Sequence, residues 1–488
     1  MTTSAMDATG ETPPEAPPFV WTAKYTGALF VLCLAQLIES LDITVVNVAL
    51  PAIQSDVGFS DNTLQWVVSA YTVLFGGFLL LGGRSGDLFG KRRVFTTGIA
   101  VFAVASLVTG VATSAGLLTT GRALQGLSAA FVSPMTLAMI GVIFPEGKAR
   151  NKAFGVWGTT TGISTSAGVI LGGLFTSGPG WRWIFFINLP IALLLLWGAK
   201  RYLPADGERT SAKGFDILGA ILVTAGTSLA VYACVQTQDH AWGSTRTLSL
   251  LFIALLLLIA FVAYEAKVAK QPLVVFSIFR SRAVSGANVV AVFVGASLLA
   301  MFYCLSLYEQ QVLGYSALKT GLSYLPLTGM LTACAFLAPA LIPRIGIRAV
   351  ILLGSLIATA GLIMFARITP SGGIWNDVIL PSLIVSPGLA LTFIPMSMAA
   401  VTGVAPEHMG FASGMANVTR TLGSAIGLAV IATLAATKTA DKVASGQNVI
   451  DATSSGFTLG FAVCACLMAG AAVASLLLPG KPKEQVAS

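Results

Sequence analysis

Long apolar stretches dominate this sequence, and their length places the strongest limit on its fold. A helix needs about 20 apolar residues to cross the hydrocarbon core of a bilayer. Windows that meet this requirement recur at 26–53, 63–82, 94–113, 117–143, 150–177, 181–199, 215–236, 247–266, 284–310, 320–342, 349–367, 374–398, 408–437 and 454–478. The sequence therefore predicts an all-α polytopic membrane protein with fourteen transmembrane helices.

The composition excludes a soluble protein of ordinary make-up. Of the 488 residues, 55% are hydrophobic and 10% are charged, whereas about 25% are charged in a typical soluble domain. The residues before Phe19 are polar and proline-rich, so we expect the first apolar segment to remain as an uncleaved anchor. All six cysteines fall in apolar stretches, which favours neither disulfides nor a metal site. We expect no cofactor.

The net charge of +8 reflects topology. An even number of spans places both termini on one side, and most Lys and Arg residues fall on that side. The opposite side holds only Arg182, Arg246, Lys319, Arg367, Lys438 and Lys442. By the positive-inside rule the termini are predicted to be cytoplasmic. The basic residues then need no nucleic-acid partner.

Glycine positions indicate an internal repeat. Gly155, Gly168 and Gly172 are each followed by a glycine 255 residues later, and the loop at 89–92 is echoed at 345–348. We expect Asp216 to cap the first of two inserted helices. The predicted organisation is a cytoplasmic tail (1–24), a six-helix half (25–201), a linker with the two inserted helices (202–283), a second six-helix half (284–478) and a cytoplasmic tail (479–488).

Two predicted spans carry polar residues that are costly in a membrane. Glu39 and Asp42 lie about 60° apart on one helix, so both should not ionise easily in a low dielectric, and one is a candidate proton carrier. The alternative is that both are satisfied packing residues. Arg122 shares a helical face with Gln125 and Gly126. This arginine either meets a partner inside the protein or extends to the membrane surface.

A short loop between the second and third spans combines an acid with basic residues and spaced glycines. The simpler alternative is that this loop only anchors the topology, but such an anchor needs neither the acid nor the spaced glycines. The residues concerned are Gly83, Asp87, Gly90, Lys91 and Arg92. Their spacing resembles the signature loop of the major facilitator superfamily, which implies a conformational gate.

Further stretches resemble the fourteen-span drug:proton antiporters of that superfamily. The segment 41–50 followed by Pro51 is similar to their first-span signature, and the segment 181–190 is similar to a stretch of the same branch. Arg122, Gln125 and Gly126 resemble a fourth-span motif associated with proton transfer. Glu39 lies outside the first-span signature.

The fifth span resembles the antiporter motif of these proteins. Gly155, Gly168, Gly172 and Gly173 match it, but Ser164 replaces a glycine and Val169 replaces a proline. The missing proline removes an expected kink. Without this proline, the motif does not decide between export and uptake.

The resemblance implies a multi-pass protein of the bacterial cytoplasmic membrane, a monomer among lipids, that exports lipophilic or cationic drugs or antibiotics in exchange for protons. Asp42, Glu39 and Arg122 are the expected proton-coupling residues. The expected cavity residues are Gln36, Gln125, Phe302, Tyr303 and Glu309.

Four other functions are alternatives to this one. A dedicated metabolite or antibiotic exporter and a proton-coupled uptake system would use the same fold. A membrane enzyme is disfavoured, because His240 and His408, the only histidines, are predicted on opposite sides. ATP-driven export is disfavoured because no phosphate-binding loop motif occurs.

Overall fold

The computed structural model describes residues 19–59, 61–64, 66–207, 216–236, 243–269, 273–274 and 276–480. Every regular element in these ranges is a helix. Twelve helices are long and apolar enough to cross a membrane, and one bent pair raises the number to thirteen. The all-helical membrane fold is confirmed. The expected number of fourteen spans is not confirmed: the fifth long helix, Lys148–Ser177, is not among the helices that pass, and its sequence is rich in glycine, serine and threonine.

The N-terminal helices pack into one group. Its interior contacts join α1 to α6 and α8, α3 to α5, and α4 to α5 and α8. Buried phenylalanines such as Phe95, Phe102 and Phe154 fill the space between them. The group comprises α1 (Ala23–Val57), α2 (Asp61–Leu64), α3 (Trp66–Phe89), α4 (Lys91–Gly110), α5 (Ala115–Ile143), α6 (Lys148–Ser177), α7 (Trp183–Phe186) and α8 (Asn188–Tyr202).

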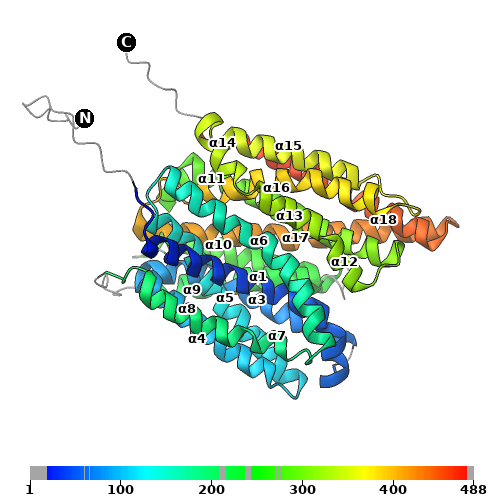
Figure 1. The fold of residues 1–488 in the computed structure, drawn as a ribbon, viewed down its shortest axis with the longest axis horizontal. Coiled ribbons are helices and arrows are strands. Elements are labelled where there is room, and N and C mark those ends of the chain that lie inside the picture. Colours follow the sequence, from blue (N-terminus) through cyan, green and yellow to red (C-terminus); the bar gives the residue numbers. More distant parts are fainter. Residues whose placement is uncertain are drawn as a thin grey trace, which may run out of the picture.

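The C-terminal helices form a second group of similar build (Figure 1). Its members are η2 (Phe276–Arg280), α11 (Arg282–Leu307), η3 (Tyr308–Val312), α12 (Ala317–Ser323), α13 (Leu325–Cys334), α14 (Leu337–Ile345), α15 (Ile347–Phe365), η4 (Ile374–Ile379), α16 (Leu380–Ala399), η5 (Pro406–His408), α17 (Met409–Ala444), α18 (Val449–Ala474) and η6 (Ser475–Leu477). The bent pair is the α12–α13 segment followed by α14, at 43°.

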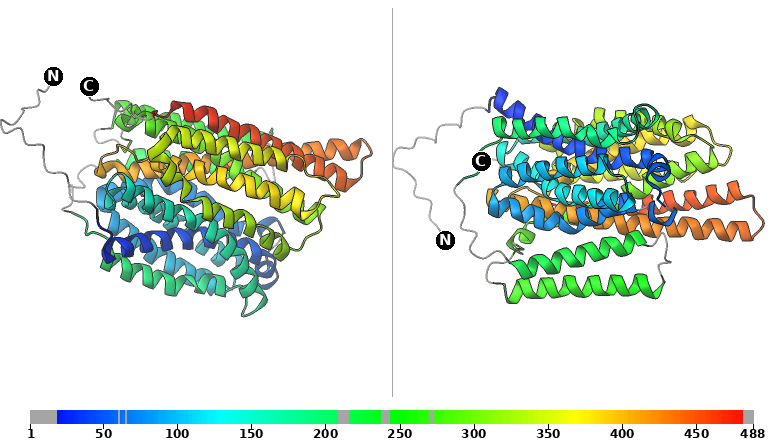
Figure 2. Two further views of the ribbon diagram at one scale, coloured as in Figure 1. Left: turned by 45° about the horizontal axis from the view of Figure 1, so that its top comes forward. Right: turned by 90° about the horizontal axis from the view of Figure 1, so that it is seen from below.

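Two further helices, α9 (Ile217–Val235) and α10 (Thr245–Lys267), lie side by side along one face of the molecule (Figure 2, right). Helix α9 packs on α3 and α17, so it touches both groups. Its first turn is capped by Asp216, whose Oδ1 accepts a hydrogen bond from the Gly219 N–H at 2.9 Å. The predicted cap is confirmed.

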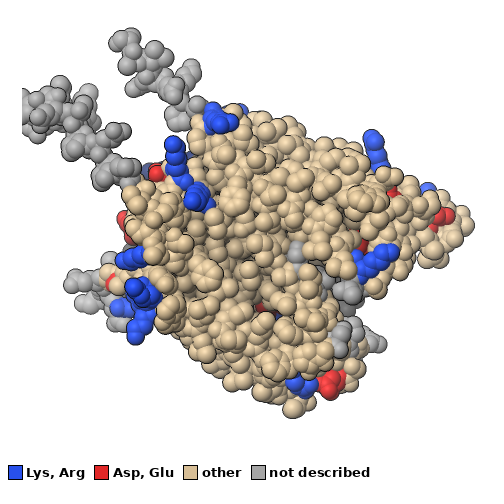
Figure 3. Space-filling model, in the orientation of Figure 1, with Lys and Arg blue, Asp and Glu red and all other residues tan. Residues whose placement is uncertain are grey.

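Both described chain ends lie at one end of the bundle, here called the terminal end; the opposite end is the far end (Figure 2, left). Lys and Arg side chains gather at the terminal end, and fewer are visible at the far end (Figure 3). Gly90 and Gly346 form equivalent turns at the terminal end, with φ of 100° and 85°. A side chain is strained at such angles, which explains the glycine in both repeated loops.

Candidate functional site

A buried polar network surrounds Asp42 inside the N-terminal group. Arg122 Nη1 donates to Asp42 Oδ2 at 2.5 Å, while Gln125 Nε2 and Asn188 Nδ2 donate to Asp42 Oδ1 at 3.1 and 3.2 Å. Asp42 is 2% exposed and Arg122 is 1% exposed. A charge this deeply buried is tolerated only with a well-placed partner. Arg122 therefore has an internal partner and does not extend to the surface.

Four helices supply this network. Asp42 comes from α1, Arg122 and Gln125 from α5, Asn188 from the start of α8, and Ser106 from α4. Gln125 Nε2 and Asn188 Nδ2 also donate to Ser106 Oγ, at 2.8 and 3.2 Å. Sequence analysis missed Asn188 and Ser106. Asn188 lies in the segment 181–190, which resembles a stretch of the antiporters, and a polar amide in this apolar segment could have marked it as a site residue.

Tyr71 separates the network from a large cavity. The Arg122 guanidinium lies 4.7 Å from the centre of the Tyr71 ring, a favourable cation–π distance, and Tyr71 also lines the cavity. The ring thus contacts the buried ion pair and borders the open space.

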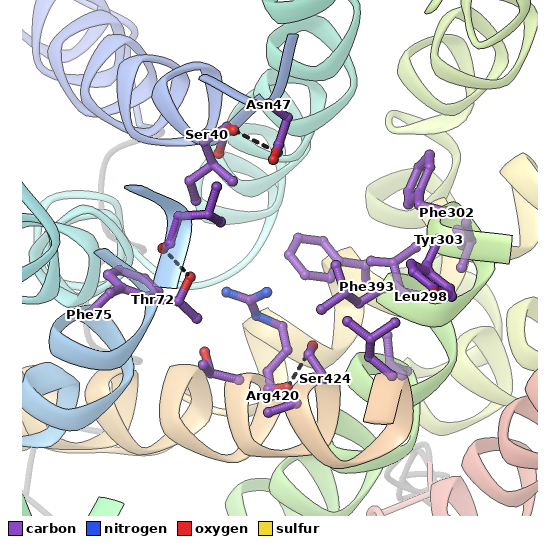
Figure 4. A pocket seen from close by; sticks show the side chains of 18 of the residues that line it. Ser40, Asn47, Thr72, Phe75, Leu298, Phe302, Tyr303, Phe393, Arg420 and Ser424 are labelled. Carbon is purple, nitrogen blue, oxygen red and sulfur yellow. Dashed lines mark hydrogen bonds between the residues drawn. The ribbon is translucent and has the colours of Figure 1, made fainter. Parts of the chain in front are cut away.

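The cavity lies between the two helix groups and measures about 980 Å³. Gln36, Phe302 and Tyr303 line it, as the sequence suggested. Helices α1 and α3 form one side, and α11, α13, α16 and α17 form the other (Figure 4). Its wall is mostly apolar. Among the described residues that line it, Glu39 and Arg420 are the two with charged side chains.

Glu39 faces a different environment from Asp42, although both belong to α1. Its carboxylate accepts a hydrogen bond from Ser133, and the residue lines the cavity, whereas Asp42 lies inside the N-terminal group. Glu39 Oε2 has no hydrogen-bond partner within the described residues. The two carboxylates therefore have separate surroundings.

Two expected cavity residues lie elsewhere. Gln125 is fully buried in the Asp42 network, where its amide satisfies Asp42 and Ser106. Glu309 is fully buried in the C-terminal group, where Ser323 Oγ lies within hydrogen-bonding distance of both carboxylate oxygens, at 2.8 and 2.6 Å. Neither side chain is among the residues that line the cavity. Each is held by neighbours that the sequence alone does not reveal.

Asp87 clasps the two helix groups together at the terminal end. Its carboxylate accepts from the backbone N–H groups of Gly410 and Phe411, at 2.8 and 2.7 Å, in the first turn of α17. Lys91 Nζ donates to Asp87 Oδ1 at 2.7 Å and to the Pro406 carbonyl at 2.9 Å. The positive end of a helix dipole favours a carboxylate at this place. We call these contacts the Asp87 clasp.

Close backbone packing reinforces the Asp87 clasp. A Cβ on Gly83 would lie 2.3 Å from the Gly410 carbonyl oxygen, and a Cβ on Gly410 would meet Gly83 equally closely. Both positions therefore require glycine. The cavity is thus closed at the terminal end by α3 and α17. Toward the far end, a notch separates the two groups (Figure 3).

The remaining basic residues of the loop are anchored by an acid that sequence analysis missed. Asp206 accepts from the backbone N–H groups of Arg92 and Arg93, both at 2.9 Å, and so caps the start of α4. A Cβ on Gly90 would lie 2.4 Å from the Asp206 carboxyl carbon. Gly90 is needed for this contact as well as for its turn.

The glycines of α6 face two different partners. Gly155 approaches Pro339 of α14, whereas Gly168 and Gly172 approach Thr44 and Val48 of α1. Gly173 is half-buried, and the side chain of Val169 lies outside the described part of the chain. Small residues permit such close helix contacts. Helix α6 therefore joins α1 to the C-terminal group.

Known proteins resemble this chain in sequence and in fold. The family model of the Major Facilitator Superfamily matches residues 32–428. The chain is 37% identical to the puromycin resistance protein of Streptomyces alboniger over 89% of this chain and 87% of that one. It is 36% identical to the cephamycin export protein of Amycolatopsis lactamdurans over 85% of each chain. The human organic anion transporter MFSD10 shares the fold, with a TM-score of 0.66 and 15% identity, covering 93% of this chain and 100% of that one. The chain, a multi-span membrane protein, belongs to the major facilitator superfamily.

Proposed function

We propose that this protein exports drug-sized amphiphilic molecules, antibiotics among them, and is driven by inward proton flow across a bacterial cytoplasmic membrane. The observation that carries the proposal is the apolar cavity of about 980 Å³ between two helix groups, closed at one end. This volume is at the upper end of the range for small-molecule sites, about 300–1,000 Å³. The puromycin resistance and cephamycin export proteins support the substrate class.

In this proposal the two groups act as the six-helix halves of an alternating-access transporter. The basic residues gathered at the terminal end favour a cytoplasmic location for that end. The Asp87 clasp then closes the cytoplasmic side while the far end faces outward. Release of the clasp would let the halves rock and open the cavity inward. The transporter would work as a monomer among lipids, because one chain supplies both halves.

Asp42 is the proposed proton carrier, with Arg122 as its electrostatic partner. Desolvation favours a neutral carboxyl group, whereas a guanidinium in contact favours the carboxylate. A conformational change that separates the pair or alters its hydration would change the proton affinity of Asp42. Tyr71 contacts Arg122 and lines the cavity. Substrate that displaces the Tyr71 ring would therefore change the surroundings of the Asp42–Arg122 pair. Proton and substrate would thus occupy different places.

Expression in a drug-sensitive bacterial host tests the proposal. Cells that produce the protein should accumulate less of a lipophilic dye or antibiotic, such as ethidium or puromycin, than cells with an empty vector. A protonophore should abolish the difference. Efflux that persists after collapse of the proton gradient, with ATP intact, would rule out secondary antiport. Higher accumulation in producing cells would instead indicate uptake.

A further inference from the structure

The cavity contains one acidic and one basic side chain, and these come from opposite helix groups. Glu39 belongs to α1 and Arg420 belongs to α17. The two interact electrostatically. No hydrogen bond joins them among the described residues, and Glu39 Oε2 has no partner there. The two charges therefore attract each other across the cavity, but the Glu39 carboxylate keeps one oxygen without a hydrogen bond.

Arg420 has more donors than its protein partners use. A guanidinium carries five N–H donors in a planar fork. Within the described part of the chain, its side chain makes one hydrogen bond, from Nη2 to Asn417 Oδ1 at 3.3 Å. In Figure 4 the side chain rises from α17 into the cavity, between Thr72 and Phe393. The remaining donors are thus available to a molecule in the cavity.

Apolar side chains surround this guanidinium. Phe75, Leu298, Phe302 and Phe393 line the same space. Phe393 stacks on Trp157, with ring centroids 6.1 Å apart and planes 7° apart, which holds its ring in place. A cationic fork set among aromatic rings suits a ligand with an acidic group on a flat apolar body.

We infer that Arg420 binds an acidic group, such as a carboxylate, sulfonate or phenolate, of an amphiphilic substrate whose apolar body packs on the aromatic wall. This inference rests on the proposed export function, because it names the substrate class of the same cavity. Glu39 competes with the ligand for the field of Arg420. Because Arg420 keeps unused donors that only an acceptor can satisfy, anionic molecules are bound in preference to cationic ones of the same shape.

Three probes with one apolar body test this inference: pyrenebutyrate, its methyl ester, and a pyrenebutyl trimethylammonium salt. Binding is measured on the full-length protein in lipid nanodiscs by saturable energy transfer from tryptophan to pyrene, since Trp157 lies beside the cavity wall. The wild type should bind the anion most tightly. Arg420→Gln should weaken anion binding by about ten- to hundredfold, as expected for loss of a charged hydrogen bond, and should leave the ester within about twofold.

Two further variants keep the test decisive if Arg420→Gln folds poorly. Glu39→Gln removes the competing negative charge, so it should tighten anion binding and weaken cation binding. Lys438→Gln is the matched control, because it removes one positive charge from an exposed position on the same helix. It should change none of the three affinities.

Equal binding of the three probes, or anion binding that is unchanged in Arg420→Gln and Glu39→Gln, would overturn the inference. Tighter binding of the cation than of the anion would overturn it as well. Proton-driven transport of the same probes in everted vesicles tests the export function separately. Anion-selective binding without any transport would contradict the proposed function and leave the Arg420 site standing.

Discussion

Asp42 and Arg122 form a buried ion pair, and replacing either residue is expected to destabilise the protein. Removing one member of a buried pair leaves an uncompensated charge, which typically costs about 3–5 kcal/mol. Gln125 and Asn188 hold the carboxylate from a second side. An amide at position 42 could keep these two contacts, so a substitution there changes charge more than shape.

The first prediction concerns Asp42→Asn. This variant should imitate a permanently protonated carrier: substrate still binds, but proton-driven accumulation falls at least about tenfold, equivalent to about 1.4 kcal/mol. The measurement is transport against external pH at matched surface expression. Wild-type coupling in this variant would remove Asp42 from the proton pathway.

Glu39 supplies the matched comparison on the same helix. Glu39→Gln should retain proton coupling and change substrate preference, because Glu39 lines the cavity and lies outside the Asp42 network. The same pH-dependent transport assay separates the two variants. Loss of coupling in Glu39→Gln alone would place the proton site one helical turn away from Asp42.

At the scale of elements, the contact between α3 and α17 is the one that closes the terminal end of the cavity in the proposed mechanism. Asp87→Asn removes the charge that Lys91 and the first turn of α17 share. Expression should stay near the wild-type level, while turnover falls and the population shifts away from the conformer described here. The change is local, because Gly83 and Gly410 still permit close packing.

Spin labels can report this shift directly. Glu146 and Glu407 are exposed residues at the terminal end, one in each helix group, and both can be changed to cysteine in a background without the six native cysteines. The inter-label distance should lengthen in Asp87→Asn. An unchanged distance distribution together with unchanged transport would reduce the loop to a topology anchor.

A separate contact joins the end of α1 to the segment before α7 at the far end. The Arg182 guanidinium and the Trp181 indole N–H both bond Asp56 and hold the pKa of its carboxyl below the usual value. Because the pKa is lower in the folded state, this stabilisation is present above the unfolded pKa and is lost as pH falls through the folded pKa. The pair is largely exposed, so its contribution is expected to be below about 1 kcal/mol.

Asp56→Asn should therefore lower the melting temperature slightly at neutral pH. The difference from the wild type should shrink as pH falls below about 4, the usual carboxyl range. Thermal denaturation of both proteins across pH checks this, with Arg182→Gln and the double variant as controls. A difference that grows on acidification would mean that another group causes it.

At the scale of the whole molecule, periodicity and spacing predicted the helical membrane fold and many of the residues that meet in it. The sequence predicted a shared helical face for Arg122 and Gln125, and both lie in one buried network, although Gln125 was expected in the cavity. Asn188, Ser106 and Asp206 could not be assigned to their partners, because those contacts depend on which distant helices pack together. Likewise, the position of Glu309 along the chain could not reveal that its carboxylate is buried against the Ser323 hydroxyl.

The central claim is that proton movement drives substrate movement through this cavity. The most direct test is simultaneous measurement of proton and substrate fluxes in everted membrane vesicles, with an imposed gradient that is acidic inside. The wild type should accumulate ethidium or pyrenebutyrate while protons leave the vesicles, and Asp42→Asn should do neither at matched protein levels. Substrate accumulation without accompanying proton flux, or equal accumulation by Asp42→Asn, would contradict the account.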